Sequence, residues 1–271
     1  MENIPKDIYT EPEPAVDTLA NLGPLTGMAG IWVGTHGLDV NPKPNGPEKQ
    51  AFIEHMELQP IDAQTNGPQL FYGLRYHTRI VKPDDVETFH DQVGYWLWEP
   101  ATGTVIQTLS IPRGQAAMAV GRAEADARTF RLEAVRGSET NGIVSNPFLE
   151  YAFRTKSYII TVAINVDGTW SYEQDTVLII PGQAEPFHHT DRNTLRKVGE
   201  PTPNPTAQAA AYTVTARALS DDALQAMARI VKAERVRSGG IGGFFDSVDA
   251  DKRSEFAGIG CWQGVHRDTI E

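Results

Sequence analysis

Short segments rich in β-branched and aromatic residues recur along most of this chain, and they constrain its fold more than any other feature. From Gly27 onward, runs of about five to twelve residues rich in Val, Ile, Thr, Tyr, Phe and Trp are separated by clusters of Gly, Pro, Asn and Asp. Within residues 129–135, the apolar Phe130, Leu132 and Ala134 alternate with charged or polar neighbours. This alternation predicts strands with one face buried.

The segments are joined in a way that favours an antiparallel sheet. Asp167-Gly168 and Thr102-Gly103 each lie between two strand-like runs, as expected of hairpin turns. No helical pattern interrupts residues 27 to about 198, which disfavours parallel crossovers. Closure of such a sheet removes its unpaired edges. We therefore expect an all-β fold, an up-and-down antiparallel β-barrel.

The regions outside the strands have different compositions. Residues 1–23 lack a sustained period and are expected to form a tail or strap, whereas residues 24–198 form the barrel. Residues 199–208 carry three prolines and are expected to be a linker. The C-terminal extension, residues 209–271, contains a capped amphipathic helix pattern over about 220–237. Such a helix must dock on the barrel, close one end of it, or pair with a second subunit as a homodimer.

Charge and cysteine content exclude several classes of function. The formal net charge is −11, so the chain should repel nucleic-acid backbones and anionic lipid surfaces. The single cysteine, Cys261, allows neither an intrachain disulfide nor a thiolate metal cage. The first residues lack the features of a secretory signal, and no apolar run is long enough to span a membrane. We expect a cytoplasmic protein without nucleic-acid or membrane partners.

A repeated glycine pattern opens the first strand of the predicted barrel. Gly30 and Trp32 form a G-x-W motif, and in calycin-type barrels a tryptophan at this place plugs one end of the cavity. The pattern continues with Gly34 and Gly37. Repeated glycine within a strand indicates the close approach of a ligand or of a neighbouring backbone.

Three histidines are candidate ligands, although none belongs to a multi-histidine zinc motif. His188 and His189 are adjacent on an extended segment, so they should point to opposite faces of it. Asp191 should point the same way as His189, either as its hydrogen-bond partner or as a turn residue. His90 stands at the beginning of a strand. Each of these side chains can also be a structural polar residue.

Several segments, in order, resemble the nitrobindin-like family of haem-binding β-barrels, which has also been described as fatty-acid-binding-protein-like. The resemblance covers residues 24–198 and implies a barrel of about ten strands with an open, apolar pocket for a ferric b-type haem. The matching segments are LTGMAGIWVGTHG, LFYGLRYHTRI, FHDQVGYWLWEP with VIQTLSIPRG, the Asp167-Gly168 hairpin with WSYEQDTVLII, and FHHTDRNTLRKV.

The resemblance also implies roles for individual residues. His189 is the expected axial ligand of the iron, with His188 as the alternative, and His90 is expected on the opposite face of the haem. The implied activity is the binding of nitric oxide and the isomerisation of peroxynitrite to nitrate, so an enzyme of this type would be a peroxynitrite isomerase.

Two other functions remain open at this point. The same barrel can serve as a metal-free carrier of an apolar small molecule, such as a fatty acid or another lipid-like ligand. An enzyme acting on a polar ligand would require the extra histidines to converge. In each case we expect the polar loop 41–49 or part of the C-terminal extension to cover the pocket mouth.

Overall fold

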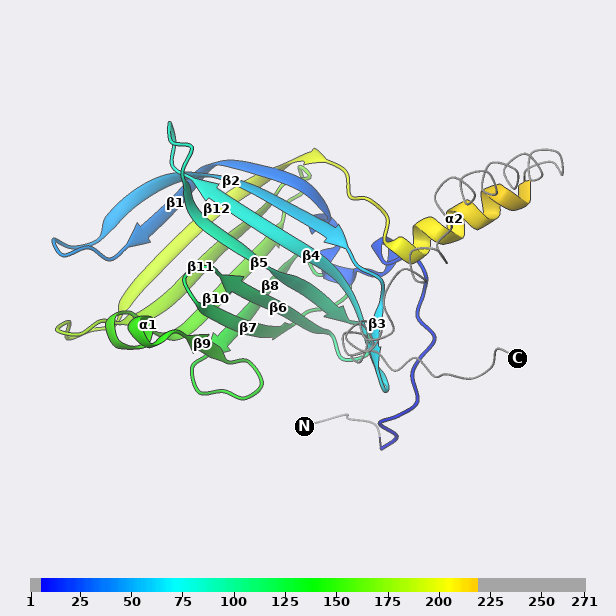
Figure 1. The fold of residues 1–271 in the computed structure, drawn as a ribbon, viewed down its shortest axis with the longest axis horizontal. Helices are drawn as coiled ribbons and strands as arrows, with labels where there is room; N and C mark the ends of the chain where they lie inside the picture. Colours follow the sequence, from blue (N-terminus) through cyan, green and yellow to red (C-terminus); the bar gives the residue numbers. More distant parts are fainter. Residues whose placement is uncertain (1–5, 219–271) are drawn as a thin grey trace, which may run out of the picture. The chain divides into compact units, whose positions relative to one another are not determined.

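Ten long strands and two short ones account for most of the chain that the structure describes, as Figure 1 shows. The structure is a computed structural model that describes residues 6–218, with side chains up to residue 211. The helical segments are η1 (Leu19–Asn21), η2 (Gly23–Met28), α1 (Pro147–Ala152) and α2 (Pro205–Ala218). The strands are β1 (Gly30–Asn41), β2 (Glu48–Pro60), β3 (Gln64–Asn66), β4 (Gln69–Val81), β5 (Thr88–Glu99), β6 (Thr104–Ile111), β7 (Gln115–Arg122), β8 (Thr129–Val135), β9 (Ile143–Ser145), β10 (Arg154–Ile164), β11 (Trp170–Ile179) and β12 (Phe187–Gly199).

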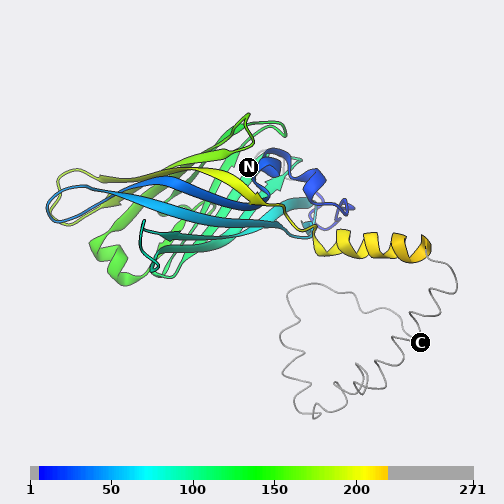
Figure 2. The same ribbon diagram turned by 90° about the horizontal axis from the view of Figure 1, so that it is seen from above.

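The ten long strands form a closed antiparallel barrel (Figures 1 and 2). Their hydrogen-bonded order is β2-β1-β12-β11-β10-β8-β7-β6-β5-β4, and the additional pairing of β2 with β4 closes the ring. Apart from the pairing of β12 with β1, neighbouring long strands of the ring follow one another along the chain, so the topology is up-and-down and β12 returns to lie beside β1. The predicted barrel is confirmed.

Tryptophan side chains pack the end of the barrel at which β1 begins. Trp32, Trp96 and Trp170 are each no more than 1% exposed, and the rings of Trp32 and Trp170 meet edge to face at 6.2 Å. The indole Nε1 of Trp32 donates a hydrogen bond to the backbone oxygen of Met28, at 2.8 Å. Met28 ends η2, which packs its buried Leu25 into the same core. The strap before β1 and the tryptophans therefore close this end.

A carboxyl group is buried among these apolar side chains. Glu54 of β2 is 1% exposed, and its Oε2 accepts hydrogen bonds from the Tyr172 hydroxyl at 2.8 Å and from Nδ2 of Asn193 at 3.0 Å. Thr78 donates to Oε1 at 3.3 Å. Burial raises the pKa of Glu54 above its ordinary value, although the three hydrogen bonds oppose this shift. The acid is thus held in the barrel by polar contacts from three strands.

The two later glycines of the G-x-W-x-G-x-x-G motif make room for side chains of the protein itself. A Cβ atom at Gly34 would lie 2.3 Å from the amide of Asn193, and one at Gly37 would lie 2.2 Å from the ring of Phe52. The pairing of β1 with β2 changes register between these glycines. The expected close approach is confirmed: side chains approach these two glycines, whereas at Gly30 the approaching group is the backbone oxygen of Gly199.

A short helix interrupts the strands where the sequence predicts none. α1 lies between β9 and β10, and its cap, Asn146, accepts a hydrogen bond from the backbone N–H of Leu149 at 3.0 Å. Pro147 follows at the first helical position, where its missing N–H is not needed. A helix of six residues is too short to show an apolar stripe, which is why periodicity did not reveal it.

The proline-rich segment after the barrel is ordered. Its Asn204 is 1% exposed, accepts a hydrogen bond from the backbone N–H of Thr18 at 3.1 Å and donates to the backbone oxygen of Val16 at 2.9 Å. α2 begins at Pro205, inside the 199–208 segment expected to be a linker, because a proline fits the first turn of a helix.

The helix predicted over 220–237 lies outside the described residues. Within residues 6–218, no helix is long and apolar enough to cross a bilayer.

The buried Glu54 should make stability depend on pH. Its native pKa lies above the ordinary value of 4.5, so the folded protein binds more protons than the unfolded chain and stability falls as pH rises through that window. Glu54→Gln should remove this fall and stabilise the protein at pH 8, by about 1.4 kcal/mol for each unit of the pKa shift. Urea denaturation between pH 4 and pH 8 measures this. The exposed Glu57, on the same strand, provides the control Glu57→Gln, which should keep the pH dependence of the unsubstituted protein.

The fit between Gly37 and Phe52 predicts a coupling between the two positions. Gly37→Ala should cost about 1–3 kcal/mol of stability because the new methyl group overlaps the Phe52 ring. In the double variant with Phe52→Leu, the loss should be smaller than the sum of the two single losses, since the smaller side chain gives way. Denaturant titration of the four proteins measures the coupling. Additive losses would contradict this explanation of the glycine.

Candidate functional site

A pocket opens at the end of the barrel where β1 ends and β2 begins. Its volume is about 390 Å³, within the range of about 300–1,000 Å³ usual for small-molecule sites. Its apolar lining comprises Pro42, Phe52, Ile80, Phe89, Leu109, Ile111, Ala117, Ile143, Leu149, Phe153 and Leu178. The polar lining comprises Asp39, Asn41, Lys43, Glu48, Lys82, His90, Gln92, Arg113, Gln115, Thr155, Tyr158, Gln174, Thr176, His189 and Asp191.

The two adjacent histidines of β12 lie on opposite faces of the barrel wall. His189 lines the pocket and its side chain is 33% exposed. His188 points away from the pocket, is 63% exposed, and its Nδ1 lies 2.8 Å from Oδ2 of Asp175. The opposite orientation predicted from the sequence is therefore confirmed. Of the two histidines, His189 is the one that a ligand in the pocket can reach.

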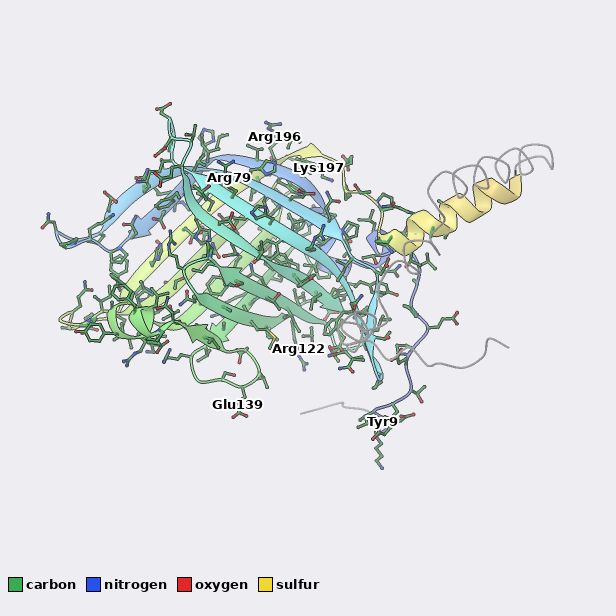
Figure 3. All side chains as sticks on the ribbon, viewed as in Figure 1. Tyr9, Arg79, Arg122, Glu139, Arg196 and Lys197 are labelled. Atoms are coloured by element: carbon green, nitrogen blue, oxygen red, sulfur yellow. The ribbon has the colours of Figure 1, made fainter. Side chains whose placement is uncertain are left out.

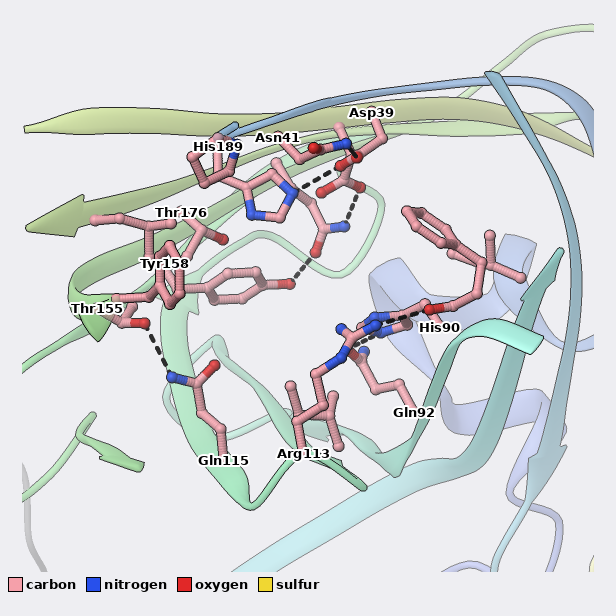
Figure 4. A pocket seen from close by; sticks show the side chains of 18 of the residues that line it. Asp39, Asn41, His90, Gln92, Arg113, Gln115, Thr155, Tyr158, Thr176 and His189 are labelled. Carbon is pink, nitrogen blue, oxygen red and sulfur yellow. Dashed lines mark hydrogen bonds and ion pairs between the residues drawn. The ribbon is translucent and has the colours of Figure 1, made fainter. Parts of the chain in front are cut away.

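A hydrogen bond with a carboxylate anchors the imidazole of His189. Its Nε2 lies 2.7 Å from Oδ1 of Asp39, a β1 residue whose Oδ2 accepts a hydrogen bond from Asn41 at 2.7 Å (Figure 4). Burial alone lowers the pKa of His189, but the hydrogen bond and charge of Asp39 outweigh burial and raise it. For Asp39, burial acts in the opposite direction and raises the pKa. The hydrogen bonds from His189 and Asn41 outweigh burial, so the pKa of Asp39 lies below its ordinary value. The carboxylate thus fixes one ring nitrogen, and Nδ1 has no hydrogen-bond partner among the described residues.

The second predicted histidine lies in the same pocket. His90 of β5 contacts Gln92, with 3.3 Å between Nε2 and Oε1, and Gln92 donates to the Tyr76 hydroxyl at 2.7 Å. Burial lowers the pKa of His90, and the positive charge of Arg113 lowers it further. The imidazole is therefore neutral at pH 7 and can donate one hydrogen bond. Figure 4 shows His90 and Gln92 across the pocket from His189.

Asp191 shares the pocket with His189, but it is not the hydrogen-bond partner of that histidine. Oδ1 of Asp191 accepts a hydrogen bond from Gln174, which itself contacts the Tyr158 hydroxyl. Burial raises the pKa of Asp191 to about 7. Asp39, which the sequence analysis did not single out, is the partner of His189 instead. The two residues are far apart in the sequence and meet because β1 pairs with β12.

The donor set suits a cofactor that brings most of its own metal ligands. In the part of the chain from residue 6 to residue 218, no three His, Cys, Asp or Glu side chains are grouped to hold a metal ion. The pocket instead offers single imidazoles on facing walls, set among apolar side chains. A haem needs from the protein one axial nitrogen and apolar walls for its ring. The residues present fit this cofactor.

A family model agrees with this chemistry. The family model described as "THAP4-like, heme-binding beta-barrel domain" matches residues 21–197. No curated protein matches the chain. Among solved structures, the chain is similar to the crystal structure of Rv2717c from M. tuberculosis, with 22% sequence identity, a TM-score of 0.44, and coverage of 67% of this chain and 97% of that chain.

The family model extends from the strap before β1 to Lys197, two residues before the end of β12, and so includes almost the whole barrel and both pocket histidines. The chain belongs to the family of THAP4-like, haem-binding β-barrel domains.

Proposed function

We propose that the pocket binds haem b through His189 and that the bound haem binds nitric oxide and isomerises peroxynitrite to nitrate. The observation that carries the proposal is a pocket with apolar side chains in its walls, with His189 on one wall, held by Asp39, and His90 on the facing wall. A ferric haem held by His189 would supply a Lewis-acidic iron for a diatomic or peroxy ligand. The expected activity of the nitrobindin-like family is consistent with this arrangement.

The protein contributes binding, orientation and a hydrogen-bond donor. The hydrogen bond of Asp39 keeps the proton on Nε2 of His189 and leaves the Nδ1 lone pair for a metal. The apolar side chains of the walls reduce access of water to the ring of the cofactor. His90, neutral because of its burial, can donate its N–H to an oxygen or nitrogen atom of a ligand near it.

We further propose that the protein works in the cytoplasm on small molecules. A single cysteine is consistent with a reducing compartment. The acidic net charge does not favour nucleic acid as a partner. The homodimer that the C-terminal helix pattern suggests stays a prediction, because residues 219–271 lie outside the described part of the chain.

Substitution of three histidines tests the proposal in protein loaded with haem. His189→Ala should abolish the Soret band of bound ferric haem, because the apolar walls alone do not hold the iron. His188→Ala is the matched control and should keep the full spectrum, since this side chain lies on the outer face. His90→Ala should keep the haem and change the rate constants of nitric oxide binding. Absorption spectra and stopped-flow kinetics measure these effects.

The alternatives predict different results. If the protein is a metal-free carrier, haem should bind no more tightly than other apolar molecules, and His189→Ala should leave its affinity unchanged. If His188→Ala loses the haem and His189→Ala retains it, the proposed ligand is wrong. The isomerase activity requires that catalytic amounts of loaded protein accelerate peroxynitrite decay and raise the yield of nitrate. Haem binding without that acceleration would reject the enzymatic part of the proposal.

The Asp39 contact predicts a second effect on haem affinity. Asp39→Asn retains a group that can bond to His189 but removes its charge, so haem affinity should fall by about 10- to 100-fold. Asp175→Asn is the matched control, because Asp175 holds the outward-facing His188 in the same way. Titration of the two apoproteins with haem gives both affinities. Equal affinities would show that Asp39 does not support the ligand.

A further inference from the structure

Two cations without a carboxylate partner stand at the rim of the pocket. Arg113 lies in the turn between β6 and β7, and Lys82 directly follows β4. Both line the pocket, and neither forms an ion pair with any described residue. The chain as a whole carries a net charge of −11, yet no carboxylate of the described residues forms an ion pair with these two cations.

Both cations are held against the same residue. Nη2 of Arg113 donates a hydrogen bond to the backbone oxygen of Phe89 at 2.8 Å. Nζ of Lys82 lies 5.3 Å from the centre of the Phe89 ring. Phe89 is the extra residue of a bulge, since the register of β4 with β5 shifts between Ile80 and Val81. The bulge therefore gathers the two positive charges next to His90.

Among the other charged side chains that line the pocket, Asp191 accepts a hydrogen bond from the neutral Gln174, and the rest have a partner of opposite charge or an imidazole partner. Lys43 of the β1–β2 turn and Glu48 at the start of β2 form an ion pair at 3.3 Å, and Asp39 is hydrogen-bonded to His189. The acidic residues 84, 85 and 87 lie in the loop after Lys82, but none of them forms an ion pair with it. Arg113 is oriented toward His90 (Figure 4), and four of its five N–H donors have no partner among the described residues. The rim thus offers a site of positive charge and hydrogen-bond donors.

We propose that Arg113 and Lys82 form an anion site that binds the carboxylate groups of the apolar ligand in the pocket. Guanidinium groups bind carboxylates through paired, charge-assisted hydrogen bonds, and a lysine adds a flexible point charge. The inference rests on the proposed function in that the carboxylates come from the tetrapyrrole of haem. A fatty-acid ligand would present the same chemistry, so the experiment must separate the two sources.

Iron-free protoporphyrin IX is the probe, because it carries the two carboxylates but cannot be ligated by a histidine. Binding to the full chain is followed by porphyrin fluorescence, in parallel with the dimethyl ester of the same porphyrin. The unsubstituted protein should bind the diacid more tightly than the ester, and added salt should weaken only the diacid. The double variant Arg113→Gln/Lys82→Gln should lose about fivefold in diacid affinity for each cation removed, with ester affinity unchanged.

A matched variant controls for the change in net charge. Arg122→Gln/Arg196→Gln removes two exposed cations that do not line the pocket and that are labelled in Figure 3. It should bind the diacid as tightly as the unsubstituted protein. Equal diacid affinity in the rim variant and the unsubstituted protein would overturn the anion site, as would a loss of the same size in the control.

Two further experiments distinguish failure of the anion site from failure of the proposed haem function. In the His189→Ala background, the two rim substitutions should still weaken the diacid and not its ester even if haem binding is lost, because the anion site does not use iron. Cis-parinaric acid and its methyl ester test the fatty-acid source. If the rim variant weakens the fatty acid while no porphyrin binds, the anion site holds and the haem proposal fails. If haem binds through His189 and the rim variant weakens no carboxylate, the haem proposal holds and the anion site is rejected.

Discussion

The pairing of β2 with β4 is the contact on which the rest of the structure depends. It runs from Ile53 opposite Val81 to Pro60 opposite Leu74 and turns an open sheet into a ring without free edges. In the ring, alternate side chains of every strand point into one interior. Because an eight-stranded barrel is just filled by side chains, a barrel of ten strands has room left over. Tryptophans and the strap fill one end, and the space that remains is the pocket.

The interior holds carboxyl groups in two different electrostatic states. Asp39 has an imidazole partner, and its hydrogen bonds to His189 and Asn41 overcome burial and lower its pKa. Asp191 lines the same pocket but accepts its hydrogen bond from the neutral Gln174, so burial dominates and raises its pKa to about 7. One acid therefore stays charged and orients a histidine, whereas the other can carry a proton at neutral pH. Neighbouring carboxyls that differ in this way are common at functional sites.

The sequence was sufficient to predict the barrel and the two histidines of the pocket, but not their partners. Alternating apolar residues specify strands, and the position of a histidine within a strand specifies its face, so His188 and His189 had to diverge. Alternation does not reveal which strand lies beside which, and Asp39 reaches His189 only because the first long strand pairs with the last. Likewise, α1 is too short to have a period, and the order of residues 199–204 depends on contacts with the strap.

The features that the periodic pattern misses are concentrated where function is expected. Arg113 lies in a turn, Phe89 in a bulge and Lys82 just beyond a strand, and none of these positions contributes to the apolar alternation that determines the fold. Turns and bulges tolerate such side chains because their backbone does not have to continue the ladder of the sheet. The strands therefore fix the width of the pocket and the places of its histidines, whereas the irregular segments at the rim set its charge. Selection for a particular ligand can act on that rim without disturbing the hydrogen-bonded ring below it.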